Sequence, residues 1–118
     1  MIFTLALLAT ADFCTPGGAD ADPIQAVRSF VDALNAHDQT AYNRTITEDA
    51  DFVMGAGENL DLSELINVYA SNAHLDIKRI RLAAPGVVEV EAHSSQGEDF
   101  VSRFKVDGGC VTEMKQIG

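Results

Sequence analysis

The chain has 118 residues, 47% of them hydrophobic, and a formal net charge of −10 at pH 7. This length accommodates one domain with an ordinary core, and the apolar fraction excludes a disordered chain. The acidic surface repels phosphate backbones, so we expect no nucleic-acid partner. No apolar run approaches the roughly 20 residues of a spanning helix, so we expect no integral membrane segment.

Residues 1–21 read as a leader that resembles a signal peptide. An apolar run over residues 2–11 ends in Ala9-Thr10-Ala11, and a second A-x-A pattern ends at Ala21. Signal peptidase cleaves after such patterns, and we therefore suspect export to the periplasm or the medium. No basic residue precedes the run. The alternative is a cytoplasmic protein whose N-terminus packs on the domain.

The two cysteines, Cys14 and Cys110, bear on the same question. In an exported chain they invite a disulfide, whereas in a cytosolic chain such residues usually remain thiols. If the protein is exported, we predict a Cys14–Cys110 bond that pins the leader to the fold. Cleavage after residue 11 preserves Cys14, and cleavage after residue 21 removes it. There is no C-x-x-C and no third cysteine, so we expect no zinc site.

The predicted domain covers residues 22–118 and begins with a helix. Asp22 is a suitable N-cap and Pro23 suits the first helical position. We expect the helix to end near Ala36 and His37 to adopt the left-handed conformation there. Apolar residues recur at helical spacing at Ile24, Val27, Phe30, Val31 and Leu34.

Asp38 can cap a second, short helix, which the pattern extends to residues 47–49 with Tyr42 and Ile46 on its apolar side. A strand is expected over residues 51–54. Asp61 and Glu64 then make a D-x-x-E cap for a third helix.

Four strands are expected in the last 45 residues. The first covers residues 74–82, with a bulge near Lys78 and Arg79 because Ile77 and Ile80 are out of phase. The next strands are residues 87–94, 100–106 and 110–117. The last two are joined by a hairpin turn at residues 107–109, Asp-Gly-Gly.

This order of elements resembles the nuclear-transport-factor-2-like superfamily, which includes the SnoaL-like cyclases and the ketosteroid isomerases. The most typical part is the helix, the acidic cap, the short helix and the sequence TEDADF at residues 47–52 leading into a strand. The resemblance implies an α+β class with a cone-shaped, curved, mixed or antiparallel sheet wrapped around N-terminal helices. This is a cystatin-like α+β roll that encloses a pocket.

Alternation along the strands sorts the sheet into two faces. The charged set, which includes Glu89, Glu91 and Arg103, is expected on a solvated outer face. The side chains expected to line the pocket are Phe30, Leu34, Tyr42, Phe52, Met54, Tyr69, Val90, Ala92, Ser102, Phe104, Thr112 and Met114.

The pocket set contains hydroxyls but no Asp, Glu or His, whereas general acid–base chemistry needs a titratable group within reach of the substrate. The ketosteroid isomerases carry a helix tyrosine and a general-base aspartate, and the matching positions here are Phe30 and Met54. Asp51 could tilt inward from its strand end, and a bulge could turn the His74–Asp76 pair toward the cavity. Two His and one Asp, namely His74, His93 and Asp76, lack metal-ligand spacing, so we expect no metal and no cofactor.

Three functions therefore stay open. The first is a non-catalytic pocket domain that binds a small apolar molecule or a protein partner. The second is an isomerase, cyclase or dehydratase acting on a hydrophobic carbonyl compound. It would use Asp51, His74 and Asp76 for acid–base chemistry and Tyr42 or Tyr69 to stabilise an enolate-like oxygen. The third is an interaction module whose sheet self-associates, which leaves a monomer or a homodimer.

Overall fold

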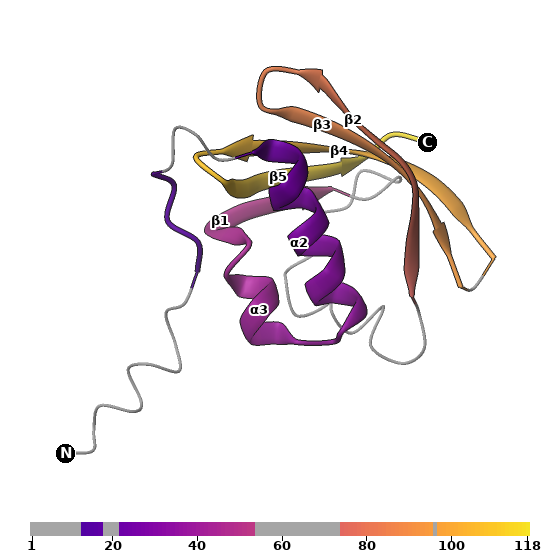
Figure 1. The fold of residues 1–118 in the computed structure, drawn as a ribbon, viewed down its shortest axis with the longest axis horizontal. Coiled ribbons are helices and arrows are strands. Elements are labelled where there is room, and N and C mark those ends of the chain that lie inside the picture. Colours follow the sequence, from indigo (N-terminus) through magenta and orange to yellow (C-terminus); the bar gives the residue numbers. More distant parts are fainter. Residues whose placement is uncertain (1–12, 18–21, 54–73, 96) are drawn as a thin grey trace.

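The computed structural model describes residues 13–17, 22–53, 74–95 and 97–118. Two helices precede five strands in these residues (Figure 1). The predicted third helix, the strand position Met54, Tyr69 and the apolar run of the leader lie outside the described residues. No helix in the described part of the chain has the length and apolar character needed to cross a membrane. The elements are α2 (Pro23–Asn35), α3 (Gln39–Asn43), β1 (Ile46–Val53), β2 (Leu75–Ala84), β3 (Val87–Ser94), β4 (Asp99–Asp107) and β5 (Cys110–Gln116).

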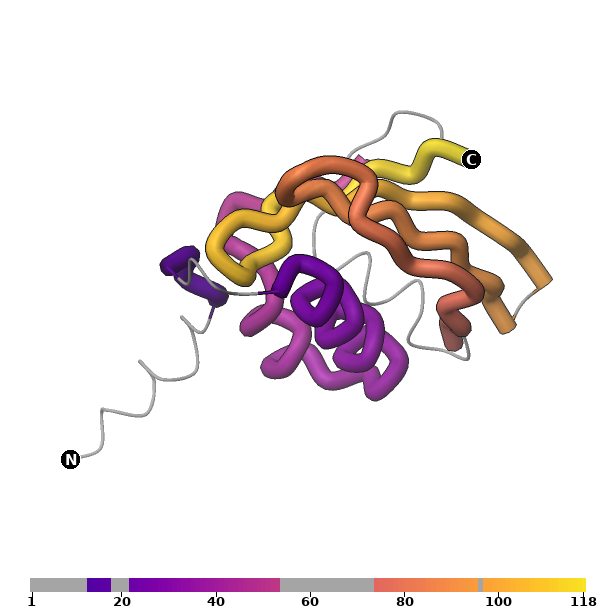
Figure 2. The backbone as a smooth tube through the Cα atoms, turned by 45° about the horizontal axis from the view of Figure 1, so that its top comes forward, coloured from indigo at the N-terminus to yellow at the C-terminus, as the bar shows by residue number. Residues whose placement is uncertain are grey.

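The five strands form one mixed sheet in the order β1-β5-β4-β3-β2. Strand β1 runs parallel to β5, and the other neighbours are antiparallel. Figure 2 shows α2 and α3 on one side of the curved strands. The predicted α+β class with a curved sheet around the N-terminal helices is thus confirmed.

The N-terminal signals of α2 act as predicted. The Asp22 carboxylate accepts a hydrogen bond from the Ile24 backbone N–H at 3.0 Å, and Pro23 occupies the first turn. The helix ends at Asn35, and His37 has a positive φ of 55°. A left-handed residue just after the last turn ends the helix and redirects the chain toward α3.

The predicted boundary between α3 and β1 is wrong by several residues. Helix α3 stops at Asn43, and β1 begins at Ile46 rather than at residue 51. The hydroxyl of Thr45 donates to the carbonyl of Tyr42 at 2.7 Å, which closes the short helix. Ile46 then pairs with Val111 of β5, and the register shifts between Ile46 and Asp51. This irregularity hides the alternation that would have revealed the strand.

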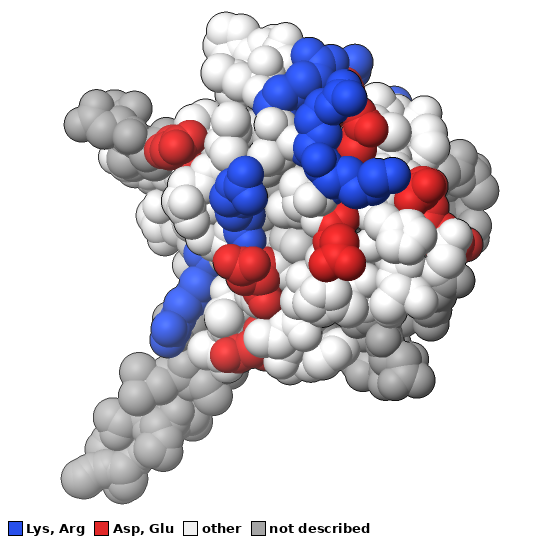
Figure 3. Space-filling view, turned by 45° about the vertical axis from the view of Figure 1, so that its right-hand side comes forward, with Lys and Arg blue, Asp and Glu red and all other residues white. Residues whose placement is uncertain are grey.

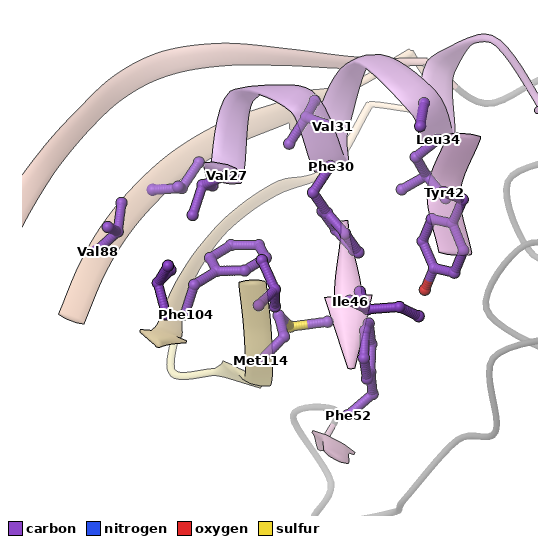
Figure 4. Packing of buried hydrophobic residues seen from close by; sticks show 14 residues of the cluster. Val27, Phe30, Val31, Leu34, Tyr42, Ile46, Phe52, Val88, Phe104 and Met114 are labelled. Carbon is purple, nitrogen blue, oxygen red and sulfur yellow. The ribbon is translucent and has the colours of Figure 1, made fainter. Parts of the chain in front are cut away.

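The core lies between α2 and the concave face of the sheet, with Phe30 at its centre. Its ring centroid lies 5.1 Å from Tyr42, 5.8 Å from Phe52 and 5.3 Å from Phe104. Figure 4 shows this ring reaching from α2 between Phe104 on one side and Tyr42 on the other. Tilted and edge-to-face arrangements at these separations are favourable for aromatic pairs. The cluster ties α2, α3, β1 and β4 into one core.

Residues 13–17 are attached to the sheet beside the start of β1 and the β4–β5 turn. Cys14 and Cys110 form a disulfide, with their Cα atoms 5.7 Å apart. The backbone N–H of Cys14 also donates to the carbonyl of Ile46 at 2.8 Å, and that of Gly17 donates to Gly108 at 3.3 Å. A Cβ on Gly108 would come within 2.6 Å of the Gly17 nitrogen, and Gly108 has a φ of 55°. The β4–β5 turn therefore needs glycine at this position.

A candidate pocket between the helix and the sheet

An apolar hollow lies between α2 and the concave face of β2 to β5. The free space in this partly open hollow is about 40 Å³. Helix periodicity turns one row of α2 side chains toward the sheet, and alternation turns every second side chain of the strands toward α2. The lining residues are Phe30, Val31, Leu34, Leu75, Val90, Ala92, Phe100, Ser102, Phe104, Met114 and Gln116.

Two polar side chains, Ser102 and Gln116, lie among these lining residues. They stand directly opposite each other on β4 and β5. A hydroxyl and a primary amide can both donate and accept hydrogen bonds, but neither is a general base at neutral pH. The described lining can therefore hold and orient a carbonyl or hydroxyl group.

The side chain of Asn35 fixes one wall of the hollow. Its amide nitrogen donates to the carbonyl of Leu75 at 2.9 Å, and the Leu75 backbone N–H donates to its amide oxygen at 2.8 Å. The last residue of α2 thus pairs with the start of β2 as a neighbouring strand would. Asn35 is a positioning residue, because Leu75 lines the hollow and Asn35 does not.

Most of the predicted pocket residues in the described part of the chain do line the hollow. They are Phe30, Leu34, Val90, Ala92, Ser102, Phe104 and Met114.

Three predicted pocket residues lie elsewhere. Tyr42 and Phe52 are buried in the core behind Phe30. The hydroxyl of Thr112 donates to the carbonyl of Lys105 at 3.3 Å and is not part of the lining. Four further lining residues are not among the predicted ones: Val31, Leu75, Phe100 and Gln116. The helical spacing of Val31 was a usable signal, and no local signal marks Gln116.

The three acid–base candidates are outside the hollow. Asp51 is exposed and pairs in register with Glu113 of β5. His74 Nε2 lies 3.3 Å from the Asp76 carboxylate, with the two side chains 55% and 70% exposed. The predicted bulge of β2 is present between residues 77 and 79. It keeps Ile77 and Ile80 partly buried against the core rather than turning Asp76 inward.

Two carboxylates of the described residues have a lowered pKa, and both belong to ion pairs outside the hollow. A hydrogen bond from Arg81, helped by Arg103, lowers the pKa of Glu89. A hydrogen bond from His93 at 2.6 Å lowers the pKa of Asp99. Within the described residues, no three His, Cys, Asp or Glu side chains are grouped so as to hold a metal ion.

Comparisons place this fold among solved structures. The sequence matches no family model, and no curated protein matches it. An uncharacterised cystatin-fold protein from Novosphingobium aromaticivorans superimposes with a TM-score of 0.73 and 19% identity, over 82% of this chain and 98% of that one. IdmH from Streptomyces antibioticus, a candidate polyketide cyclase, gives 0.69 and 15% over 81% and 91%.

An NTF2-like protein of unknown function from Cytophaga hutchinsonii gives a TM-score of 0.65 with 13% identity, over 84% of this chain and 91% of that one. Identities this low establish the fold and leave the chemistry open. The resemblance stated from the sequence is thus confirmed for the fold. The chain has the cystatin-like α+β fold of the nuclear-transport-factor-2-like proteins.

Proposed function

We propose that this chain is a binding domain whose hollow takes a small apolar molecule and performs no reaction on it. The observation that supports the proposal is the lining. It is apolar on both the helix and the sheet side, and Ser102 and Gln116 are its polar members among the described residues. Binding sites for small molecules typically combine an apolar wall with a few polar groups that orient the ligand.

The size of the hollow defines the ligand further. Its 40 Å³ is well below the roughly 300–1,000 Å³ of pockets for drug-sized ligands. A ligand must therefore be very small, or it must displace side chains on entry. Met114 is unbranched and adaptable, and Phe100 is only partly buried. We infer a hydrocarbon-like ligand with one carbonyl or hydroxyl group near Ser102.

Thermal shift with a matched pair of variants tests this proposal. The probes are a small cyclic ketone, a fatty acid, a steroid ketone and an aromatic polyketide. Ala92→Leu fills the hollow, whereas Ala83→Leu adds the same atoms at an exposed position of β2. We expect a probe to raise the melting temperature of the parent and of Ala83→Leu but not of Ala92→Leu. If no probe raises it, or if all three proteins respond equally, the hollow is not a binding site.

An isomerase, cyclase or dehydratase is the second candidate. Its support is the structural likeness to a candidate polyketide cyclase. Its residues are Asp51, His74 and Asp76, which all stand outside the hollow described here. Loss of turnover of a hydrophobic carbonyl compound in Asp51→Asn or Asp76→Asn, with unchanged melting temperature, would favour this candidate over simple binding.

We also propose that the protein works in an oxidising compartment. Support comes from the Cys14–Cys110 bond, since disulfides persist in exported proteins and are rare in the cytosol. Intact mass of protein recovered from the host medium or periplasm, with and without reductant and alkylation, reports both the bond and the cleavage site. Protein found only in the cytosolic fraction, at full length and with two alkylated thiols, would contradict export.

A further inference from the structure

The cations of this acidic protein are concentrated on one side of the sheet. Six of its eight Lys and Arg residues lie in β2, β4 and β5, and only Arg28 and Arg44 lie elsewhere. Figure 3 shows the largest group of Lys and Arg side chains together near the top of that view, with carboxylates beside them. We use the name outer sheet face for the outward side chains of β2 to β5, on the side away from α2.

A basic row crosses the outer sheet face from strand to strand. Arg81 stands opposite Glu89, Glu89 opposite Arg103, and Arg103 opposite Lys115. Three cations with one carboxylate give this row a formal charge of +2, whereas the whole chain carries −10.

The charges flanking the basic row are balanced. Arg79 pairs with Glu91 at 3.3 Å on one side, and Lys105 pairs with Glu113 at 3.0 Å on the other. Asp51 of β1 stands next to Glu113 at the border of this face. The excess positive charge therefore belongs to the basic row itself.

Glu89 holds two guanidinium groups of this row in place. Arg81 Nη2 donates to one carboxylate oxygen at 3.0 Å, and Arg103 Nε donates to the other at 3.3 Å. The Glu89 side chain is 14% exposed, whereas both arginine side chains are 53% exposed. A guanidinium has five N–H donors in a rigid fork. The remaining donors are thus pre-positioned near the surface, which lowers the entropy cost of binding an acceptor.

An open hollow of about 330 Å³ adjoins the basic row. Arg103 and Lys115 lie side by side in its middle, because they are register partners on β4 and β5. Val87 and Ile117 add apolar surface at its edges, and Ile117 is 44% exposed. The Lys105–Glu113 ion pair also lines the hollow and is neutral as a pair. The hollow therefore offers Arg103 and Lys115 as cations outside that pair, together with an apolar contact.

We propose that the outer sheet face docks an acidic segment of a partner protein. An Asp or Glu carboxylate of the partner binds between Arg103 and Lys115, and a neighbouring apolar side chain packs against Ile117. Charge complementarity supports this occupant, because guanidinium forks match carboxylates bidentately. The carboxylates elsewhere on this acidic chain oppose docking only weakly, since the screening length is about 8 Å at physiological ionic strength.

Two other occupants fit the charges less well. The same face of a second copy would bring two basic rows together, and like charges across an interface oppose association. A nucleic acid would extend beyond the basic row over flanking ion pairs that carry no net positive charge.

Fluorescence anisotropy tests the proposal with a labelled pentapeptide, Glu-Glu-Leu-Glu-Glu, and its Gln-Gln-Leu-Gln-Gln counterpart. We expect the Glu peptide to bind the parent at an ionic strength of about 0.15 M and the Gln peptide to bind much more weakly. Arg103→Gln with Lys115→Gln should weaken binding roughly five- to tenfold. Arg28→Gln with Arg44→Gln removes the same charge elsewhere and should change the affinity less than about twofold.

Lys115→Glu serves as a second variant, because no salt bridge in the described structure involves Lys115 and its replacement leaves Glu89 paired. It should weaken binding at least as much as Lys115→Gln alone. Equal binding of the two peptides, equal loss in the two double variants, or no binding at about 1 mM peptide would overturn the proposal. Preference for a DNA oligonucleotide would assign the face to nucleic acid. Self-association that only the Arg103 and Lys115 substitutions abolish would assign it to a second copy.

Discussion

The disulfide is the contact whose removal has the most calculable effect on stability. Cys14→Ser removes the cross-link at a half-buried position and leaves the fully buried Cys110 in place as a thiol. The core around Cys110 therefore keeps its volume. We expect the variant to fold to the same structure with a much smaller free energy of unfolding.

The size of the loss follows from the loop that the bond closes. The two cysteines are separated by 96 residues. The chain-entropy model assigns about 5 kcal/mol at 25 °C to a loop of this length. A domain of this kind has roughly 5–15 kcal/mol of stability in total. The bond therefore accounts for a third or more of it.

Urea unfolding followed by circular dichroism measures the loss, with and without reductant. The parent under reductant and Cys14→Ser under either condition should share one midpoint, because none of them has the cross-link. The oxidised parent should unfold at a urea concentration higher by about 2 M or more, given slopes of roughly 1–3 kcal/mol per M. A difference below about 1 kcal/mol would refute the loop-entropy reasoning. Oxidised and reduced parent with the same midpoint would show that the bond does not form.

Three further changes test the core, the wall of the hollow and the outer sheet face. Phe30→Ala should cost about 3–5 kcal/mol of unfolding free energy in urea, because the 2% exposed ring leaves a cavity among three aromatic neighbours. Asn35→Asp should cost about 1–3 kcal/mol in the same assay, since it replaces the donor to the Leu75 carbonyl by a charged acceptor. Glu89→Gln should remove a pH-dependent part of the stability. The folded-state pKa of Glu89 is lowered by Arg81 and Arg103, so the stabilisation is complete above the ordinary Glu value of about 4.3 and disappears as the pH falls through the lowered pKa.

Each of these has a matched control. Phe30→Leu keeps most of the apolar volume and should lose less stability than the alanine variant. The penalty of Asn35→Asp should shrink at a pH low enough to protonate the new carboxyl, and a pH-independent penalty would contradict the hydrogen-bond account. Glu98→Gln changes an exposed carboxylate on the β3–β4 connection and should leave the acid limb of the stability profile unchanged. If the acid limb of the stability profile were the same in Glu89→Gln and in the parent, the predicted link between Glu89 ionisation and stability would be wrong.

Much of the fold could be predicted because its local signals agree with one another. Residues 87–94 alternate between apolar and charged positions, and the strand found there has the predicted bounds. Asp22 and Pro23 predicted the start of α2, because both residue types suit the first positions of a helix. The start of β1 could not be predicted, because the polar residues after Ile46 lie at a sheet edge where pairing with β5 decides the conformation.

The candidate site could be predicted from the sequence less completely than the fold. Helical and strand periods identified Phe30, Leu34 and Phe104 as inward-facing, but the size of the hollow depends on how these side chains interdigitate. Periodicity carries no information about that packing. Likewise, Asn35 looks like an ordinary last helical residue in the sequence, and its two bonds to Leu75 depend on a residue 40 positions away.

The bond between Cys14 and Cys110 changes what a protease can do to this protein. Both ends of the described domain are joined, because the linked residues lie before α2 and at the start of the last strand. A single backbone cut anywhere between them leaves two fragments that remain covalently attached. Such fragments keep a high effective concentration for each other and can reassociate around the core. A nicked chain would therefore still migrate as one species without reductant and separate into two with it.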